Sequence, residues 1–341
     1  MIEQHGVQAS GVQTSVSFSR ETFDSLRTQW MAVQTDSRAD FVFSFPEWQE
    51  LCWRQFREPL GYRLCLTAAR DGGELIGIAP LVISGDTASF IGTTDVCDYL
   101  DFIVRPGYEE RFFSTFFKVL HTWGVKNLDL APLRPDSTAL SYLSNLTGLS
   151  ELTGSCTTLD VSVEVDLPGT WDDFLDHLDG KQRHEVRRKL KRLEERGAIT
   201  YQASGKADPV EIETFLRLMR ISRRDKAAFM TPAMEAYFKM LARAMADRGV
   251  LKICSLRLNG RTVAATMSFN YGNSVYLYNS GYDPDYAALN VGLASKLYCI
   301  RDSIDKGKRK FDFLKGGEVY KLRLGGREVP LQRCLVRLNT K

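Results

Sequence analysis

One order of secondary-structure elements occurs twice in this chain, and that repeat constrains the fold more than any other feature. The C-terminal half predicts three antiparallel strands, a helix and a last strand, at 250–258, 262–271, 274–280, about 291–306 and 310–314. The N-terminal half predicts nearly the same order, with strands at 62–70, 75–83, 88–92 and 99–104, a helix at 109–124 and a strand at 127–130. A repeat this long indicates a duplicated domain, because solenoid repeats are no longer than about 50 residues.

Local signals support these elements. Asn259-Gly260 is a strong hairpin turn between two strands. In the following helix, the apolar residues Leu293, Leu297, Ile300 and Ile304 lie at i, i+4, i+7 and i+11. We therefore expect an α+β fold in which each half has a mixed, mostly antiparallel sheet with one parallel crossover, flanked by helices.

Length and composition limit the function. The 341 residues accommodate two domains of roughly 150 residues each. We expect a flexible tail at 1–19, an N-terminal domain at 20–167 and a C-terminal domain at 168–341. The net charge is only +3, from 45 basic and 42 acidic side chains, so overall charge gives no reason to expect DNA or a membrane as a partner. With no signal peptide or long apolar span apparent, we expect a cytoplasmic protein.

The cysteines and histidines argue against a metal centre. None of the seven cysteines forms a C-x-x-C pair, and the chain has only four histidines. We therefore expect no metal site and no disulfide framework, and we expect the cysteines to be buried reduced thiols.

Several short patterns occur in a fixed order along the C-terminal half. They are Lys181-x-Arg183 with Arg187-Arg188, Asn259-Gly260-Arg261, Tyr278-x-x-Gly281-Tyr282-Asp283-Pro284 and Phe311-Asp312-Phe313-x-x-Gly316-Gly317-Glu318-x-Tyr320-Lys321. Together they resemble the acetyltransferase-like domain of proteins associated with bacterial cellulose and exopolysaccharide synthesis. That group belongs to the GNAT superfamily and is related to the Fem-type aminoacyl transferases, which also carry two GNAT halves. The resemblance implies two tandem GNAT-like (acyl-CoA N-acyltransferase-like) domains.

The resemblance also implies a site for acyl-CoA, with acetyl-CoA as the expected co-substrate, where two parallel strands separate before a helix. The candidate cofactor-binding residues are Asn290, Val291, Gly292, Leu293 and Ala294. Leu289 stands where the superfamily has Arg or Gln. In the N-terminal half the matching site carries Glu109 and Glu110, which disfavour a polyphosphate, so we expect that half to be degenerate and to shape the acceptor groove.

Acyl transfer needs a base for the acceptor proton and a donor to the oxyanion. The candidate catalytic residues are Asp312 and Glu318 as bases, and Tyr320 as a donor to the oxyanion or the leaving thiolate. No Ser-His-Asp arrangement is apparent, so direct attack on the thioester is the simpler mechanism. The structural alternative is that Asp312 pairs with an arginine and that Tyr320-Lys321 close the sheet.

The candidate substrate-binding residues are of two kinds. Tyr276 and Tyr278 share one face of their strand and are expected in the acceptor groove. The basic candidates are Lys315, Lys321, Arg183 and Arg187, the last two on a helix at 181–196 that carries eight basic and three acidic residues. A solvated face is the default for such a helix.

Three functions compete. The first is an acyl-CoA-dependent acyltransferase that acts on an amine or hydroxyl of a sugar or polysaccharide precursor. The second is a Fem-type transferase that uses aminoacyl-tRNA, which is disfavoured because no aromatic residues interleave the basic ones. The third is a non-catalytic subunit of a polysaccharide synthesis complex. Polysaccharide-synthesis proteins at the inner membrane are the expected partners.

Overall fold

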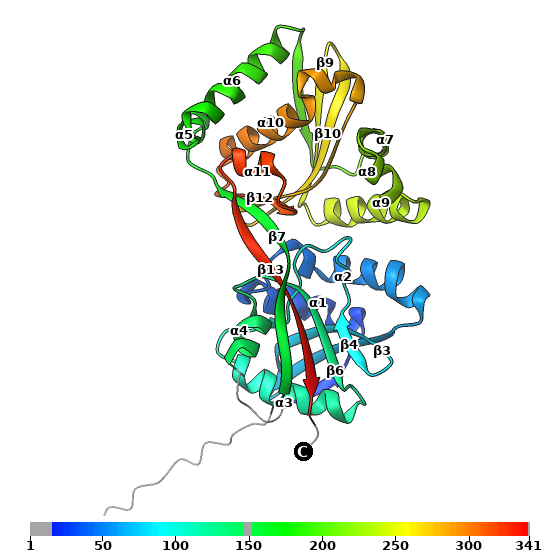
Figure 1. Cartoon of the computed structure of the whole chain (residues 1–341). Helices are drawn as coiled ribbons and strands as arrows, with labels where there is room; N and C mark the ends of the chain where they lie inside the picture. Colours follow the sequence, from blue (N-terminus) through cyan, green and yellow to red (C-terminus); the bar gives the residue numbers. More distant parts are fainter. Residues whose placement is uncertain (1–15, 146–151, 340–341) are drawn as a thin grey trace, which may run out of the picture.

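The computed structural model describes residues 16–145 and 152–339, which form two lobes stacked end to end (Figure 1). The N-terminal lobe contains β1 (Ser17–Arg20), α1 (Phe23–Asp36), α2 (Pro46–Cys52), β2 (Arg63–Asp71), β3 (Glu74–Ser84), β4 (Thr87–Phe90), β5 (Ile103–Val104), α3 (Glu109–Thr122), β6 (Asn127–Leu133) and α4 (Thr138–Asn145). The C-terminal lobe contains α5 (Trp171–His177), α6 (Gly180–Glu194), β8 (Ile199–Ser204), α7 (Pro209–Ser222), α8 (Arg224–Phe229), α9 (Pro232–Asp247), β9 (Leu251–Leu258), β10 (Arg261–Tyr271), β11 (Ser274–Tyr282), α10 (Val291–Asp305), β12 (Lys310–Lys315) and α11 (Val319–Arg323). Two long strands, β7 (Leu152–Asp166) and β13 (Arg327–Leu338), connect the lobes.

The strands form one continuous sheet that is nearly symmetric about its centre. Its order is β1-β2-β3-β4-β6-β13-β7-β12-β11-β10-β9-β8, and β5 pairs with β3. Each half has one parallel pair joined through a helix, β4 with β6 through α3 and β11 with β12 through α10. The predicted repeat and the predicted parallel crossover in each half are therefore confirmed.

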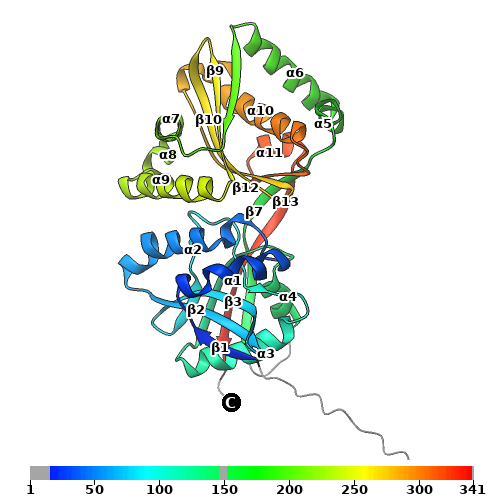
Figure 2. The same ribbon diagram turned by 180° about the vertical axis from the view of Figure 1, so that it is seen from behind.

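The two long strands exchange places between the halves. β7 and β13 pair with each other along their whole lengths, from Arg327 against Glu164 to Leu338 against Leu152. The end of β7 also pairs with β12, and the end of β13 also pairs with β6. Each lobe's sheet is thus completed by the strand that follows the other lobe's elements, and Figure 2 shows both strands crossing from one lobe to the other.

Local turn chemistry explains the hairpin that the sequence predicts. Asn259 and Gly260 both have positive φ, +50° and +80°, which a tight two-residue hairpin turn requires. β9 and β10 pair directly on either side of this turn.

Some expected elements differ. The strand expected at 99–104 is reduced to β5, which has two residues. The expected tail at 1–19 lies mostly outside the described residues, and its last three residues belong to β1, which pairs with β2. The division into two domains after residue 167 remains a prediction. β13 follows residue 167 in the sequence but pairs with β6 of the N-terminal lobe.

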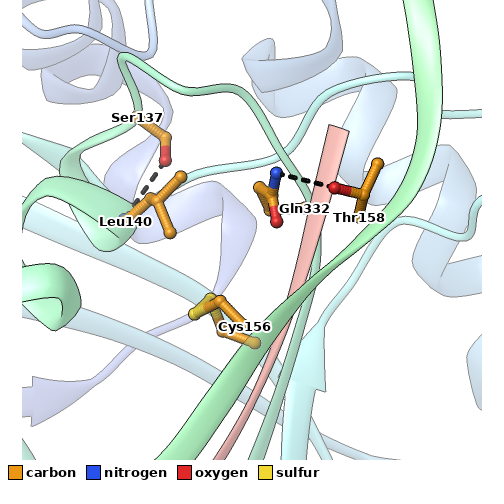
Figure 3. Close-up of a disulfide and its surroundings, with 6 residues drawn as sticks. Ser137, Leu140, Cys156, Thr158 and Gln332 are labelled. Carbon is orange, nitrogen blue, oxygen red and sulfur yellow. Dashed lines mark hydrogen bonds between the residues drawn. A yellow bond between two sulfur atoms is a disulfide. The ribbon is translucent and has the colours of Figure 1, made fainter. Parts of the chain in front are cut away.

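The expectation that all seven cysteines are reduced thiols is wrong for one pair. Cys156 on β7 and Cys334 on β13 form a disulfide across the two exchanged strands (Figure 3). They stand directly opposite each other, with a Cα–Cα distance of 4.1 Å. The register of two strands separated by 178 residues creates this pair, and no local sequence pattern signals it. The other five cysteines are free and buried.

Aromatic side chains join the two lobes. Trp48 on α2 is fully buried, and its ring lies 5.3 Å from that of Tyr278 and 5.1 Å from that of Phe269, both in the C-terminal lobe. Arg248 adds an ion pair to Glu47 at 2.6 Å. The boundary between the lobes is therefore a packed apolar core rather than a flexible linker.

This packing predicts that the lobes unfold together. Trp48→Ala should lower the unfolding free energy by about 3–5 kcal/mol, because it leaves a cavity between the lobes. Urea denaturation followed by fluorescence and by circular dichroism measures the effect, and the half-buried Trp123→Ala in the N-terminal lobe is the matched control. A loss below about 1 kcal/mol for Trp48→Ala, or two separate transitions, would contradict the account.

Candidate active site

The candidate site is built around a gap between β11 and β12. The strands pair in parallel only from Ser274 against Lys310 to Tyr276 against Asp312. Beyond this point β11 continues to Tyr282 and β12 to Lys315 without pairing to each other. The predicted separation of the two parallel strands is therefore present.

A bulge in β12 accompanies the gap. Three residue steps on β12, from Asp312 to Lys315, face only two steps on β7. Within the bulge Leu314 has φ +61°, a left-handed conformation that costs a non-glycine residue roughly 1–2 kcal/mol. The Asp312 carboxylate accepts a hydrogen bond from the Leu314 amide at 2.8 Å, and Lys321 Nζ donates to the Leu314 carbonyl at 3.1 Å. These two side chains hold the bulge in place.

A pocket of about 410 Å³, which we call the α10 pocket, lies at the start of α10. Asn290 adopts a left-handed conformation there and supplies no side-chain cap. Within the described chain, the amides of Val291 and Gly292 have no hydrogen-bond acceptor. Free amides at a helix N-terminus favour an anion.

Four of the five predicted cofactor-binding residues line this pocket. They are Asn290, Val291, Gly292 and Leu293, whereas Ala294 is buried in the lobe core. A Cβ at residue 292 would lie 2.9 Å from the Tyr282 ring, so this glycine also serves packing. A side chain at position 292 would therefore disturb the packing against Tyr282 as well as the pocket.

Basic side chains give the α10 pocket a positive charge. Four basic groups and one acidic group line it: Lys189, Arg223, Lys226, Lys296 and Glu318. Lys296 is nearly buried, and its Nζ donates to the Gly292 carbonyl at 2.9 Å. Burial, followed by the charge of Lys226, lowers the pKa of Lys296 to about 7. The sequence analysis missed all four basic residues.

A second pocket, of about 350 Å³, lies between the lobes, and we call it the interlobe pocket. The N-terminal lobe contributes Asp95 and Asp98 to it. Aromatic residues from the C-terminal lobe also line it: Phe229, Phe238, Tyr278, Phe313 and Tyr320. Burial raises the pKa of Asp98.

The two pockets share part of their walls. Arg223, Lys226, Ser280, Glu318 and Tyr320 line both of them. We call these five residues the junction. Groups bound in the two pockets would meet here.

Two predicted catalytic residues lie at the junction. Burial raises the pKa of Glu318, but its hydrogen bond and ion pair with Lys321, at 2.8 Å, outweigh burial and lower the pKa overall. Glu318 is therefore a carboxylate at neutral pH. Burial and the nearby Glu318 charge raise the pKa of Tyr320, so its hydroxyl keeps its proton.

The third predicted catalytic residue, Asp312, lies outside both pockets. It is buried beneath the N-terminal lobe, where the Tyr99 hydroxyl donates to Oδ2 at 2.6 Å and the Leu314 amide donates to Oδ1. Burial raises the pKa of Asp312 to about 6, although Tyr99 and Arg134 oppose this shift. Its observed contacts support the structural alternative more than the role of base.

Only some of the predicted substrate-binding residues line the interlobe pocket. Tyr278, Lys315 and Lys321 line the interlobe pocket, whereas Tyr276 is buried outside it. Lys321 Nζ also donates to the carbonyls of Lys315 and Gly316 at 2.8 Å, and Lys315 Nζ donates to the Thr94 carbonyl.

The two arginines predicted on α6 line neither pocket. Arg183 pairs with Asp176 at 2.6 Å, and Arg187 is exposed. On this helix it is Lys189 that reaches the α10 pocket.

The corresponding helix end in the N-terminal lobe carries an acidic side chain of the helix itself. Glu109 accepts a hydrogen bond from the Gly107 amide at 2.7 Å, at the start of α3. A carboxylate thus lies near the start of α3, and the expectation that this half is degenerate remains a prediction.

Within residues 16–145 and 152–339, no group of three or more His, Cys, Asp or Glu side chains is arranged to hold a metal ion. In the same part of the chain, no helix is long and apolar enough to cross a membrane.

The Asp312 contacts predict a pH dependence of stability. Because the folded-state pKa is raised to about 6, the native protein holds a proton that the unfolded chain releases near pH 4, so stability should fall as the pH rises from 4 to 6. Asp312→Asn should reduce this fall, as measured by urea denaturation at several pH values. Tyr99→Phe is the companion variant and should extend the fall to higher pH, since it removes a hydrogen bond that lowers the pKa. Equal pH slopes in the wild type and Asp312→Asn would contradict the assignment.

Comparison with known proteins supports the fold. Residues 180–322 match the family described as acetyltransferase (GNAT) domain. No curated protein sequence matches the chain. Among solved structures, FemX is similar over 93% of this chain and 96% of its own, with 12% identity and a TM-score of 0.65. L-PGS from Bacillus licheniformis is similar over 92% of each chain, with 12% identity and a TM-score of 0.57.

A tandem GNAT protein from the clavulanic acid biosynthesis pathway is similar over 96% of this chain and all of its own, with 11% identity and a TM-score of 0.51. At these identities the likeness concerns the fold. The chain therefore has a tandem GNAT-like fold, and the part that matches the acetyltransferase (GNAT) domain family lies in its C-terminal half.

Proposed function

We propose that the protein transfers an acyl group, with acetyl as the first candidate, from acyl-CoA to an amine or hydroxyl of a sugar or polysaccharide precursor. One observation carries this proposal. A positively charged pocket at an uncapped helix N-terminus joins, beside the gap between β11 and β12, a second pocket lined with aromatic residues.

The α10 pocket suits the donor. The free amides of Val291 and Gly292 and the helix dipole favour a pyrophosphate. Lys189 and Lys296 add positive charge around it, in a chain that lacks the superfamily's Arg or Gln before the glycine. The unpaired edges of β11 and β12 leave room for an extended pantetheine arm to reach the junction.

The junction suits direct transfer. The acceptor nitrogen or oxygen attacks the thioester carbonyl carbon, and Glu318 takes the proton that the acceptor loses. When the carbon–sulfur bond breaks, the Tyr320 hydroxyl donates a hydrogen bond to the leaving thiolate. The thiolate takes up a proton from solvent, and Glu318 releases to solvent the proton that it took from the acceptor. The products are the acylated acceptor and the CoA thiol.

The interlobe pocket suits the acceptor. Its aromatic side chains, among them Phe229, Phe238 and Tyr278, provide apolar faces on which a sugar ring can pack. Asp95 and Asp98 provide hydrogen-bond acceptors from the other lobe. A link to polysaccharide synthesis and a cytoplasmic location remain part of this proposal.

A second candidate is a Fem-type transferase that takes aminoacyl-tRNA, and the similarity to FemX favours it over a non-catalytic subunit. The exposed basic residues of α6 are the surface such a donor would need: Lys181, Arg187, Arg188, Lys191 and Arg192. A filter-binding assay with aminoacyl-tRNA at 50 and 200 mM salt separates this candidate from the first.

Acetyl-CoA binding tests the proposal. A saturating concentration should raise the melting temperature, because a ligand that binds only the folded state stabilises that state. At a ligand concentration of a hundred times Kd the free energy of unfolding increases by about 2.7 kcal/mol. Differential scanning fluorimetry with acetyl-CoA, longer acyl-CoAs and free adenosine measures the shift. No shift with any acyl-CoA, together with tight binding of aminoacyl-tRNA, would replace the first candidate by the second.

The cations of the α10 pocket give a sharper prediction. Lys296→Met should weaken acetyl-CoA binding about tenfold, because it removes a buried charge beside the helix N-terminus. A tenfold loss of affinity corresponds to about 1.4 kcal/mol of binding free energy. Isothermal titration calorimetry measures the affinity, with the exposed Lys118→Met of the N-terminal lobe as the matched control. Equal affinities for the two variants would exclude the α10 pocket as the phosphate site.

A further inference from the structure

Lys226 is the side chain on α8 that lies at the junction of the two pockets. Its Nζ donates hydrogen bonds to Asn279 Oδ1 at 2.8 Å and to the Ser280 carbonyl at 2.5 Å. Both acceptors lie on the part of β11 that no longer pairs with β12. Lys226 therefore occupies the edge of the gap itself.

A lysine ammonium has three N–H donors. The contacts to β11 use two of them, and the third has no partner among the described residues. No carboxylate of the described chain lies within 4.0 Å of Lys226 Nζ, and the side chain is half-buried in the walls of the two pockets. A half-buried cation that lines both pockets with a spare donor can receive a ligand atom that carries negative charge.

We propose that Lys226 is a catalytic residue whose third N–H stabilises the oxyanion that forms when the acceptor attacks the acyl carbonyl. This inference rests on the proposed acyl transfer and assigns the oxyanion donor that the sequence analysis left to Tyr320. The attack moves the carbonyl π electrons onto oxygen, where Lys226 donates its hydrogen bond. Collapse returns them to the carbonyl and expels the thiolate, so Lys226 gains and loses no proton.

The charges around Lys226 fit this role. Arg223 precedes α8, Asp225 lies within it, Lys296 faces the junction from α10, and Glu318 and Lys321 face it from the segment after β12. Burial, followed by Arg223, lowers the pKa of Lys226 to about 8. The ammonium form thus exists at neutral pH and is poorly compensated until negative charge develops on the substrate. Such an interaction is stronger in the transition state than in the ground state, which is the condition for raising kcat.

Two variants test this assignment by binding. S-carboxymethyl-CoA carries a carboxylate near the position of the acyl oxygen, whereas CoA carries none. Lys226→Met should weaken S-carboxymethyl-CoA binding in titration calorimetry at least tenfold more than it weakens CoA binding, because Lys226 also lines the α10 pocket, and Lys226→Arg should preserve both affinities. Affinity for S-carboxymethyl-CoA should fall more steeply above pH 8 in the wild type than in Lys226→Arg, because arginine keeps its charge there while Lys296 titrates in both.

Turnover gives the second measurement. Acetyl-CoA hydrolysis with water as the acceptor, followed by chromatography of released CoA, should slow about 10²- to 10³-fold in Lys226→Met at unchanged KM, the loss typical of one oxyanion donor. Lys118→Met is the control for a lysine removed elsewhere. Unchanged S-carboxymethyl-CoA affinity in Lys226→Met would overturn the role of Lys226. Failure of the wild type to bind either CoA compound would instead overturn the proposed function.

Discussion

The bulge at the end of β12 is the constraint on which the site depends. It places Leu314 in a left-handed conformation, and the buried Asp312 carboxylate and the buried Lys321 ammonium hold the two sides of its backbone. Because β12 pairs with β11 only as far as Asp312, the edge of β11 beyond Tyr276 is free for Lys226 and for a ligand. The same Asp312 accepts a hydrogen bond from Tyr99 of the other lobe, so the local geometry of the gap is tied to the docking of the lobes.

Exchange of β7 and β13 explains how two lobes can form one site. Each strand belongs to the sheet of both lobes, so the lobes are connected through backbone hydrogen bonds as well as through the packing of Trp48. Asp95 and Asp98 can therefore line a pocket whose other walls belong to the C-terminal lobe. The N-terminal lobe has retained the repeated topology, while Glu109 places a carboxylate at the start of its own α3.

Local patterns predicted the parts of the fold that local chemistry determines. The Asn259-Gly260 hairpin, the helix after Gly292 and the parallel crossover follow from turn residues and periodicity. The pairing of β7 with β13 could not be predicted, because the two strands are far apart in sequence and neither strand carries a local pattern that indicates its partner. Alternation along β12 puts Asp312 on the face opposite Phe311 and Phe313, but it cannot show that the N-terminal lobe covers that face. Lys189, Lys226 and Lys296 were missed because lysines on amphipathic helices ordinarily belong to the solvated side, and only the tertiary structure turns these three toward a cavity.

A crystal structure of the protein soaked with CoA tests the central claim most directly. The account predicts density for the pyrophosphate at the Val291 and Gly292 amides, with the thiol end between β11 and β12 beside Lys226. Density for CoA at another surface, or a gap that remains filled by protein side chains at saturating CoA, would contradict it.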